Sequence, residues 1–164
     1  MLTPKISEKI ARRYLLNKKT IDGEFFFAHT QGVVEAVKLL SQRFELDRNK
    51  MISLAWVHDI GYFSNDAENH AENSLKLLND ERIDLTREDK DCILNHGIGK
   101  NPLSKEGKIM QIADKISIVN KYFLKVLISN KQIKKDEIDF VKMMYEKAIE
   151  MFEKLNTLNE AEND

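Results

Sequence analysis

The stretch Ser53–Phe63, SLAWVHDIGYF, places His58 and Asp59 inside a run of apolar residues. A second carboxylate, Asp114, lies in the equally apolar segment IMQIADKISIV. An ionised carboxylate buried in such surroundings costs several kcal/mol unless it is paired or bound to a metal. We therefore expect both carboxylates to be compensated, either by Lys115 or an arginine, or by histidines that share a metal ion with them.

The composition of the whole chain indicates a globular, helical protein. Of its 164 residues, 42% are apolar and 32% are charged. Six glycines and two prolines are too few for the many tight turns of an all-β protein, so we predict an all-α fold. The length fits a single domain, residues 1–164, built as a compact bundle of six to seven helices.

Other features of the sequence indicate in which cellular compartment, and with which classes of partner, we expect the protein. The longest apolar run, Leu54–Val57, is far shorter than the roughly 20 residues that cross a bilayer, so no membrane partner is expected. The N-terminal sequence lacks the apolar block of a secretory signal, and the single cysteine, Cys92, excludes an internal disulfide framework. We expect a cytoplasmic protein. Its net charge of −1 gives no support to a nucleic-acid partner.

Helical spacing of apolar residues and the positions of capping residues predict where the helices lie. The expected helices cover approximately residues 3–18, 24–44, 47–61, 70–78, 86–97, 108–128 and 134–155. The last of them is predicted to pack on the core through an apolar stripe, and a homodimer seam is the alternative. Its stripe consists of Val141, Met144, Tyr145, Ala148, Met151, Phe152 and Leu155.

The four histidines of the chain fall on four of these helices: His29, His58, His70 and His96. The third helix is predicted to carry His58 and Asp59 on its last turn and to end at Gly61. The fifth helix is predicted to end in the same way, with His96 before Gly97. Adjacent residues on a helix point about 100° apart, so His58 and Asp59 reach one ion only if it lies near the helix flank.

Neutral imidazole and carboxylate groups together form a ligand set for a divalent first-row metal. His29 and Asp114 lie on two other predicted helices and are candidates to complete a site with His58 and Asp59. A single histidine is more often a hydrogen-bonded core or capping residue. The metal hypothesis therefore depends on the four residues taken together.

The order of these residues resembles that of a known family. His29, the doublet His58 and Asp59 within HDIG, and Asp114 within ADK reproduce the H…HD…D pattern of the HD-domain metal-dependent phosphohydrolases. The resemblance covers approximately residues 24–125 and implies an α-helical fold. It also implies that these four residues hold a first metal ion.

Members of this family with two metals carry two further histidines between the doublet and the last aspartate. His70 and His96 occupy that interval, so the resemblance implies a second ion held by these histidines and a bridging Asp59. The alternative role for either histidine is contact with a phosphate or action as a general acid. Sites rich in imidazole suit Fe, Mn, Ni, Co or Zn better than Mg.

Candidates for contacts with a phosphorylated substrate are Lys100, Lys108, Lys115 and Tyr62. Lysine is common on any surface, and Lys115 is favoured because it adjoins Asp114. Tyr62 stands where several two-metal relatives carry lysine in an HDIGK sequence, which weakens an assignment to the cyclic-dinucleotide branch. The segment 97–107, GIGKNPLSKEG, is rich in Gly, Pro and Lys and is predicted to be a mobile lid or a substrate loop.

These observations lead to the hypothesis of a metal-dependent phosphohydrolase that acts on a phosphomonoester or phosphodiester, such as a nucleotide or a related small molecule. Water activated by the metal would attack phosphorus. The predicted catalytic residues are Asp59, which holds or bridges the metals, and His96; a lysine or a histidine would assist the leaving group.

Two other functional classes remain open. The H…HD…H…H…D arrangement also resembles the mixed-valent di-iron oxygenases of the same superfamily. In some of these a lysine lies four residues after the last histidine, as Lys100 does after His96. The second alternative is a regulatory module that binds a metal or a nucleotide without turnover.

Overall fold

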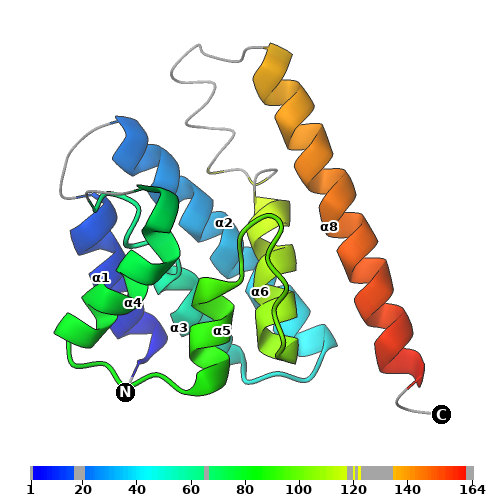
Figure 1. Cartoon of the computed structure of the whole chain (residues 1–164), viewed down its shortest axis with the longest axis horizontal. Coiled ribbons are helices and arrows are strands. Elements are labelled where there is room, and N and C mark those ends of the chain that lie inside the picture. Colours follow the sequence, from blue (N-terminus) through cyan, green and yellow to red (C-terminus); the bar gives the residue numbers. More distant parts are fainter. Residues whose placement is uncertain are drawn as a thin grey trace.

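The computed structural model describes residues 2–16, 21–64, 67–117, 120, 122 and 135–161 (Figure 1). Within these residues the chain forms seven α-helices and one short 3₁₀ helix, and no β-strand. The elements are α1 (Pro4–Leu15), α2 (Ile21–Arg43), α3 (Arg48–Val57), η1 (Ala67–Asn69), α4 (His70–Asp80), α5 (Arg87–Leu94), α6 (Lys105–Ile116) and α8 (Lys135–Ala161). This architecture confirms the all-α prediction. In the described part of the chain, no helix is long and apolar enough to cross a membrane.

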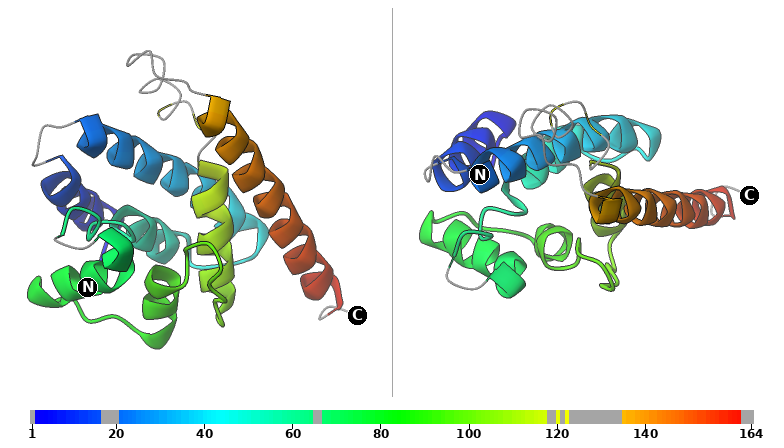
Figure 2. Two further views of the ribbon diagram at one scale, coloured as in Figure 1. Left: turned by 45° about the horizontal axis from the view of Figure 1, so that its top comes forward. Right: turned by 90° about the horizontal axis from the view of Figure 1, so that it is seen from above.

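Helix α3 lies at the centre of the bundle. Seen from above, α1 and α2 lie on one side of the molecule and α4 and α5 on the other, with α3 between them (Figure 2). Every residue of α3 from Met51 to Val57 is buried. Burial of a large apolar side chain contributes about 1.5 to 3 kcal/mol, so this core can offset the cost of polar groups held at its edge. Trp56 stacks on Phe27 of α2, with ring centroids 5.7 Å apart.

The starts of three helices follow the capping residues in the sequence. Thr3 caps α1 by accepting a hydrogen bond from the Ile6 amide, and Pro4 occupies the first helical position. Asp47 caps α3 in the same manner. At the start of α5, Thr86 and Asp89 each accept a hydrogen bond from the amide of the other, which is the predicted capping box.

The ends of two helices differ from the prediction. Helix α3 ends at Val57 and α5 at Leu94, so neither Gly61 nor Gly97 ends a helix. Among the described glycines, a positive φ occurs at Gly99, where it is 78°. Predicted ends based on glycine were wrong because glycine at these two positions does not serve as a left-handed cap. The helix predicted over 108–128 begins earlier, at Lys105, and residues 118, 119, 121 and 123–128 lie outside the described residues.

Gly61 is required by the close approach of α4. A Cβ atom at this position would lie 2.4 Å from both the His70 carbonyl oxygen and the Ser74 amide nitrogen. The Gly61 amide donates to Ser74 Oγ at 2.9 Å, and Ser74 Oγ donates to the His70 carbonyl at 2.9 Å. The glycine of HDIG therefore brings the first turn of α4, which carries His70, against the turn that carries His58 and Asp59.

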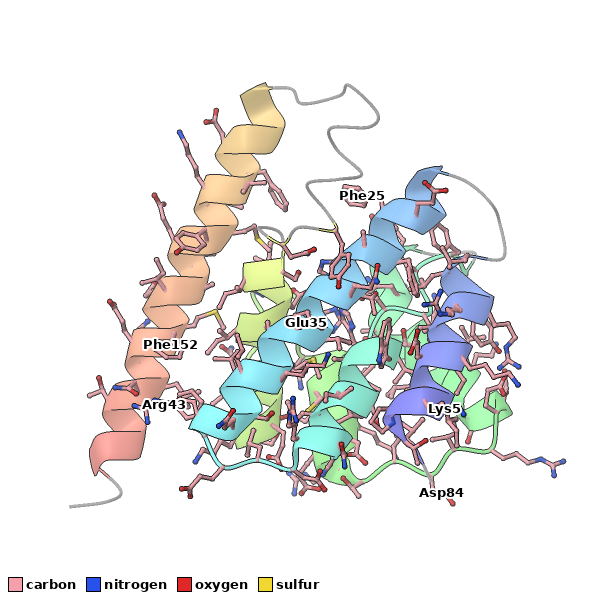
Figure 3. The ribbon with its side chains drawn as sticks, turned by 180° about the vertical axis from the view of Figure 1, so that it is seen from behind. Lys5, Phe25, Glu35, Arg43, Asp84 and Phe152 are labelled. Carbon is pink, nitrogen blue, oxygen red and sulfur yellow. The ribbon has the colours of Figure 1, made fainter. Side chains whose placement is uncertain are left out.

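Helix α8 packs against α6 at the side of the molecule opposite α1 (Figures 1 and 2). It is longer than predicted. Its buried residues are Met144, Ala148 and Leu155, whereas Tyr145 is 47% exposed, so the prediction that Tyr145 belongs to the packed stripe was wrong. Near the end of α2, Arg43 donates to Asn156, and the Phe44 ring contacts the Phe152 ring (Figure 3).

The close approach at Gly61 leads to a stability prediction. We expect Gly61→Ala to lower the free energy of unfolding by about 1 to 3 kcal/mol, because the clashing atoms belong to the backbone of α4 and cannot turn away. Urea denaturation followed by circular dichroism measures this change.

The matched control is Gly97→Ala. A Cβ there would lie 3.8 Å from Lys100 Cγ, an ordinary contact, so the expected change is within about 0.5 kcal/mol. Equal effects of the two substitutions would contradict the role assigned to Gly61.

Candidate metal centre

Six polar side chains from five parts of the chain meet beside α3. They are His29 from α2, His58 and Asp59 from the turn after α3, His70 from the first position of α4, His96 from the segment after α5, and Asp114 from α6. The turn begins immediately after Val57, and the Tyr62 amide donates to the Asp59 carbonyl. The two adjacent side chains converge at their ends, with His58 Nε2 3.2 Å from Asp59 Oδ2.

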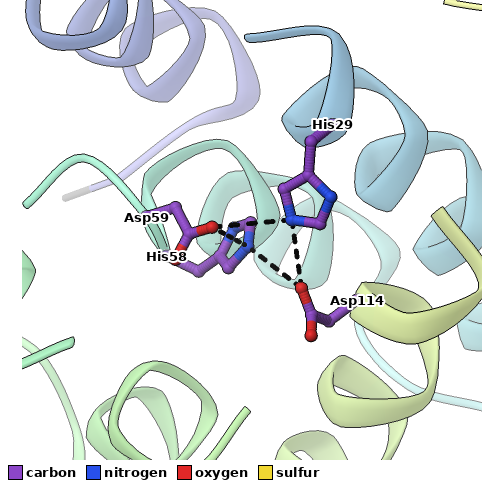
Figure 4. Close-up of side chains that lie close together, drawn as sticks. All are labelled: His29, His58, Asp59 and Asp114. Carbon is purple, nitrogen blue, oxygen red and sulfur yellow. Dashed lines mark ion pairs between the residues drawn. The ribbon is translucent and has the colours of Figure 1, made fainter. Parts of the chain in front are cut away.

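The first group of ligand-type atoms consists of His29, His58, Asp59 and Asp114 (Figure 4). His29 Nε2 lies 3.0 Å from Asp114 Oδ1 and 3.5 Å from Asp59 Oδ2. His58 Nε2 lies 3.2 Å from Asp59 Oδ2 and 3.7 Å from Asp114 Oδ1. Two imidazole nitrogens and two carboxylate oxygens therefore converge on one point.

The second group consists of His70, His96 and the other oxygen of Asp59. Asp59 Oδ1 lies 3.2 Å from His96 Nε2 and 3.5 Å from His70 Nε2. The two histidine Nε2 atoms are 3.2 Å apart. Asp59 thus divides its oxygens between the groups, with Oδ2 facing one pair of imidazoles and Oδ1 facing the other.

Three of these imidazoles are oriented by hydrogen bonds at Nδ1. His58 Nδ1 lies 2.8 Å from the Ala55 carbonyl oxygen, and His96 Nδ1 lies 2.6 Å from the Ile93 carbonyl oxygen. His29 Nδ1 lies 2.8 Å from Ser117 Oγ, whose hydrogen is donated to a backbone carbonyl. Each Nδ1 must then carry the hydrogen, so in the neutral ring Nε2 presents a lone pair to the carboxylates.

Lone pairs that face carboxylates repel them unless a positive charge lies between. For His29 and His58, burial lowers the pKa, but the contacts with Asp59 and Asp114 outweigh burial and raise the pKa to about 9 and about 10. Burial raises the pKa of Asp59 and Asp114, yet the facing histidines hold both well below the usual range. The pocket therefore stabilises positive charge, which either protons on Nε2 or a metal cation can supply.

The donor set fits a metal cation in distance and in chemistry. Two ligand atoms of one ion, with bonds of about 2.1 Å, are separated by about 3.0 to 3.4 Å at angles between about 90° and 109°. The histidine–carboxylate separations in both groups, from 3.0 to 3.7 Å, lie close to this interval. Among the described residues, His58 Nε2 and Asp59 Oδ1 are buried without a hydrogen bond of good geometry. A cation bound among the ligand atoms would provide each of these two atoms with a partner.

The predicted substrate-binding residues fall into different environments. Lys100 is exposed, and Lys108 is partly exposed, about 9 Å along the axis of α6 from Asp114. Tyr62 is partly exposed, with its ring centroid 5.6 Å from that of His70. Lys115 is 2% exposed and donates to the His96 carbonyl at 3.0 Å.

The segment that follows α5 is held on both sides. Asp91 accepts hydrogen bonds from the amides of Leu103 and Ser104 at 3.0 and 2.7 Å. Gln111 of α6 donates to the carbonyls of Asn95, Gly97 and Lys100 at 2.9 to 3.2 Å. These bonds anchor both ends of the segment 97–107, which was predicted to be a mobile lid or a substrate loop.

Three further residues hold parts of the site and were not predicted from the sequence: Gln111, Asp91 and Ser117. Gln111 is a buried polar residue within an apolar helix, which is the same signal that identified Asp114, and it could have been found in that way. Asp91 carries no such signal, because it lies on the partly exposed side of a short polar helix.

The sequence and the fold of this chain are similar to those of known proteins. The HD domain family model matches residues 26–118, more than half of the chain. The protein belongs to the HD-domain family. The matched region contains all six of the converging side chains, and α8 lies outside it.

Two similar proteins were found. A deoxyguanosinetriphosphate triphosphohydrolase-like protein of Caldanaerobacter subterraneus subsp. tengcongensis is 31% identical over 110 residues, which cover 56% of this chain and 32% of that protein. The chain thus spans about a third of the length of this curated relative. The crystal structure of a predicted HD superfamily hydrolase from an uncultured Thermotogales bacterium aligns with a TM-score of 0.56 and 22% identity, covering 93% of this chain and 91% of that one. This second likeness supports the fold.

A metal titration tests whether the converging atoms bind a cation. We expect Mn(II) to raise the free energy of unfolding of the metal-free protein, by about 2.7 kcal/mol at 100 times the dissociation constant. Asp59→Ala should abolish this stabilisation, because Asp59 contributes an oxygen to both groups. Thermal unfolding with and without Mn(II) measures the difference.

The matched control is Asp80→Ala, which removes an exposed aspartate near the end of α4. It should respond to Mn(II) like the unmodified protein. A full Mn(II) response in the Asp59 variant would rule out this centre as the binding site.

Proposed function

We propose that this protein is a metal-dependent phosphohydrolase acting on a phosphomonoester or phosphodiester. The observation that carries the proposal is the division of the Asp59 carboxylate, whose two oxygens each face a pair of histidine Nε2 atoms. His29, His58, Asp59 and Asp114 would hold one divalent transition metal ion, and His70, His96 and Asp59 a second. Fe, Mn, Ni, Co and Zn are the candidates.

A divalent metal in such a site lowers the pKa of bound water and offsets negative charge on phosphoryl oxygens. The residues of the chain orient the metal ligands and limit the access of bulk water. Fixed Nδ1 hydrogen bonds at His29, His58 and His96 keep the Nε2 lone pairs directed at the centre. The side chains of His58, Asp59 and His96 are 0 to 7% exposed, so bulk water is largely excluded around the buried carboxylate.

A nucleotide or related small molecule is the proposed substrate. The relative from Caldanaerobacter is similar over 56% of this chain, and its name describes a deoxyguanosinetriphosphate triphosphohydrolase-like protein. Exposed Lys100 and partly exposed Tyr62 would contact the substrate, since Lys100 follows His96 by four residues and Tyr62 lies beside His70. Lys108 lies about 9 Å along the axis of α6 from Asp114.

A substrate panel tests the proposed activity. The metal-free protein, reconstituted with Mn(II), Co(II) or Ni(II), should release phosphate, pyrophosphate or triphosphate from at least one nucleoside mono-, di- or triphosphate, or should open at least one cyclic nucleotide to the nucleoside monophosphate. Chelation should abolish the release, and Asp59→Ala should reduce it to the level of the metal-free protein.

The same samples separate the alternatives. Oxygen uptake with ferrous iron and organophosphonates or polyols, without hydrolysis of any nucleotide, would replace the hydrolase with a di-iron oxygenase. Tight nucleotide binding by calorimetry, with neither reaction, would indicate a regulatory module.

A further inference from the structure

Helix α6 holds the backbone of the His96 segment through two side chains one helical turn apart. Gln111 Nε2 lies 3.2 Å from the Asn95 carbonyl oxygen, 3.0 Å from that of Gly97 and 2.9 Å from that of Lys100. Lys115 Nζ lies 3.0 Å from the carbonyl oxygen of His96. Four carbonyls between residues 95 and 100 therefore accept hydrogen bonds from one face of α6.

Both donors are buried, which makes these bonds costly to break. Gln111 is 4% exposed and Lys115 is 2% exposed. Loss of either donor would leave carbonyl groups without a hydrogen-bond partner in the protein, and a buried ammonium without a partner is more unfavourable still. The segment 95–100 consequently has one favoured position against α6, in spite of a sequence that contains two glycines.

The position of this segment decides where His96 presents its imidazole. His96 lies outside the regular part of α5, so the helix alone does not fix its backbone. Its Nδ1 is held by the Ile93 carbonyl at 2.6 Å, and its own carbonyl is held by Lys115. These two bonds leave Nε2 directed at Asp59 Oδ1, 3.2 Å away.

We propose that Gln111 and Lys115 are positioning residues for the second metal group, which hold the 95–100 backbone against α6 and so fix the His96 imidazole beside Asp59. The inference rests on the proposed metal centre. Helix α6 thereby serves both groups: Asp114 contributes to the first directly, and Gln111 and Lys115 act on the second through the backbone. The two positioning residues differ in one respect, because Lys115 Nζ also lies 3.7 Å from Asp114 Oδ2, whereas the hydrogen bonds of Gln111 all go to the segment.

Calorimetric titration of the metal-free protein with Mn(II) tests the proposal without any substrate. The unmodified protein should show two binding events, one for each ion. The event that is lost in His70→Ala is then the binding of an ion to the second group. In Gln111→Met, which keeps the length of the side chain but removes its donors, the affinity of that event should fall about 10- to 100-fold while the first event is unchanged. Lys115→Met should weaken both events, because it also removes the contact with Asp114.

Lys142→Met, at an exposed position of α8, is the matched control and should bind both ions normally. Circular dichroism and the thermal midpoint establish that each variant is folded. If Gln111→Met does not fold, Gln111→Asn withdraws the same amide from the carbonyls and should give the same selective loss.

An unchanged second event in the Gln111 variant overturns the proposal, and so does an equal weakening of both events, which would indicate general loosening. Binding of only one ion by the unmodified protein also overturns it. These failures are distinct from failure of the proposed function. A protein that hydrolyses nucleotides with Mn(II) while Gln111→Met binds both ions normally would refute the positioning role alone.

Discussion

The buried Asp59 carboxylate is the constraint on which the site depends. Its oxygens face four imidazole nitrogens, and at three of the rings the hydrogen is committed to an acceptor on the opposite side. In the neutral form these three rings would present lone pairs to a buried anion, which is unfavourable in a low-dielectric interior. The site therefore favours positive charge on both sides of the Asp59 carboxylate, supplied by protons on Nε2 or by a metal cation.

Much of this arrangement can be predicted from residue type and surroundings. Asp59 and Asp114 stand in apolar stretches, and the cost of burying them predicts compensation by nearby cations or metal-sharing histidines. The all-α fold follows from the scarcity of glycine and proline, and the caps at Thr3, Asp47 and Thr86 follow from local hydrogen bonding. These features depend on interactions within a few residues, or on burial alone.

Other features depend on contacts between helices and were predicted wrongly or missed. Gly61 was interpreted as a helix end, whereas its role is to admit the backbone of α4, which no local pattern reveals. The segment 97–107 has the composition of a mobile loop, yet Gln111 and Asp91 fasten it from two directions. The hydrogen bond from Lys115 to the His96 carbonyl was likewise not predicted, because it joins residues 19 positions apart in the chain.

Crystallography of the Mn(II)-loaded protein with anomalous scattering tests directly whether Asp59 lies between two metal ions. We expect anomalous peaks on both sides of the Asp59 carboxylate, one within about 2.0 to 2.3 Å of the His29 and His58 Nε2 atoms and one at the same distance from those of His70 and His96. Peaks elsewhere on the protein, or a centre whose Asp59 oxygens contact no ion, would contradict it.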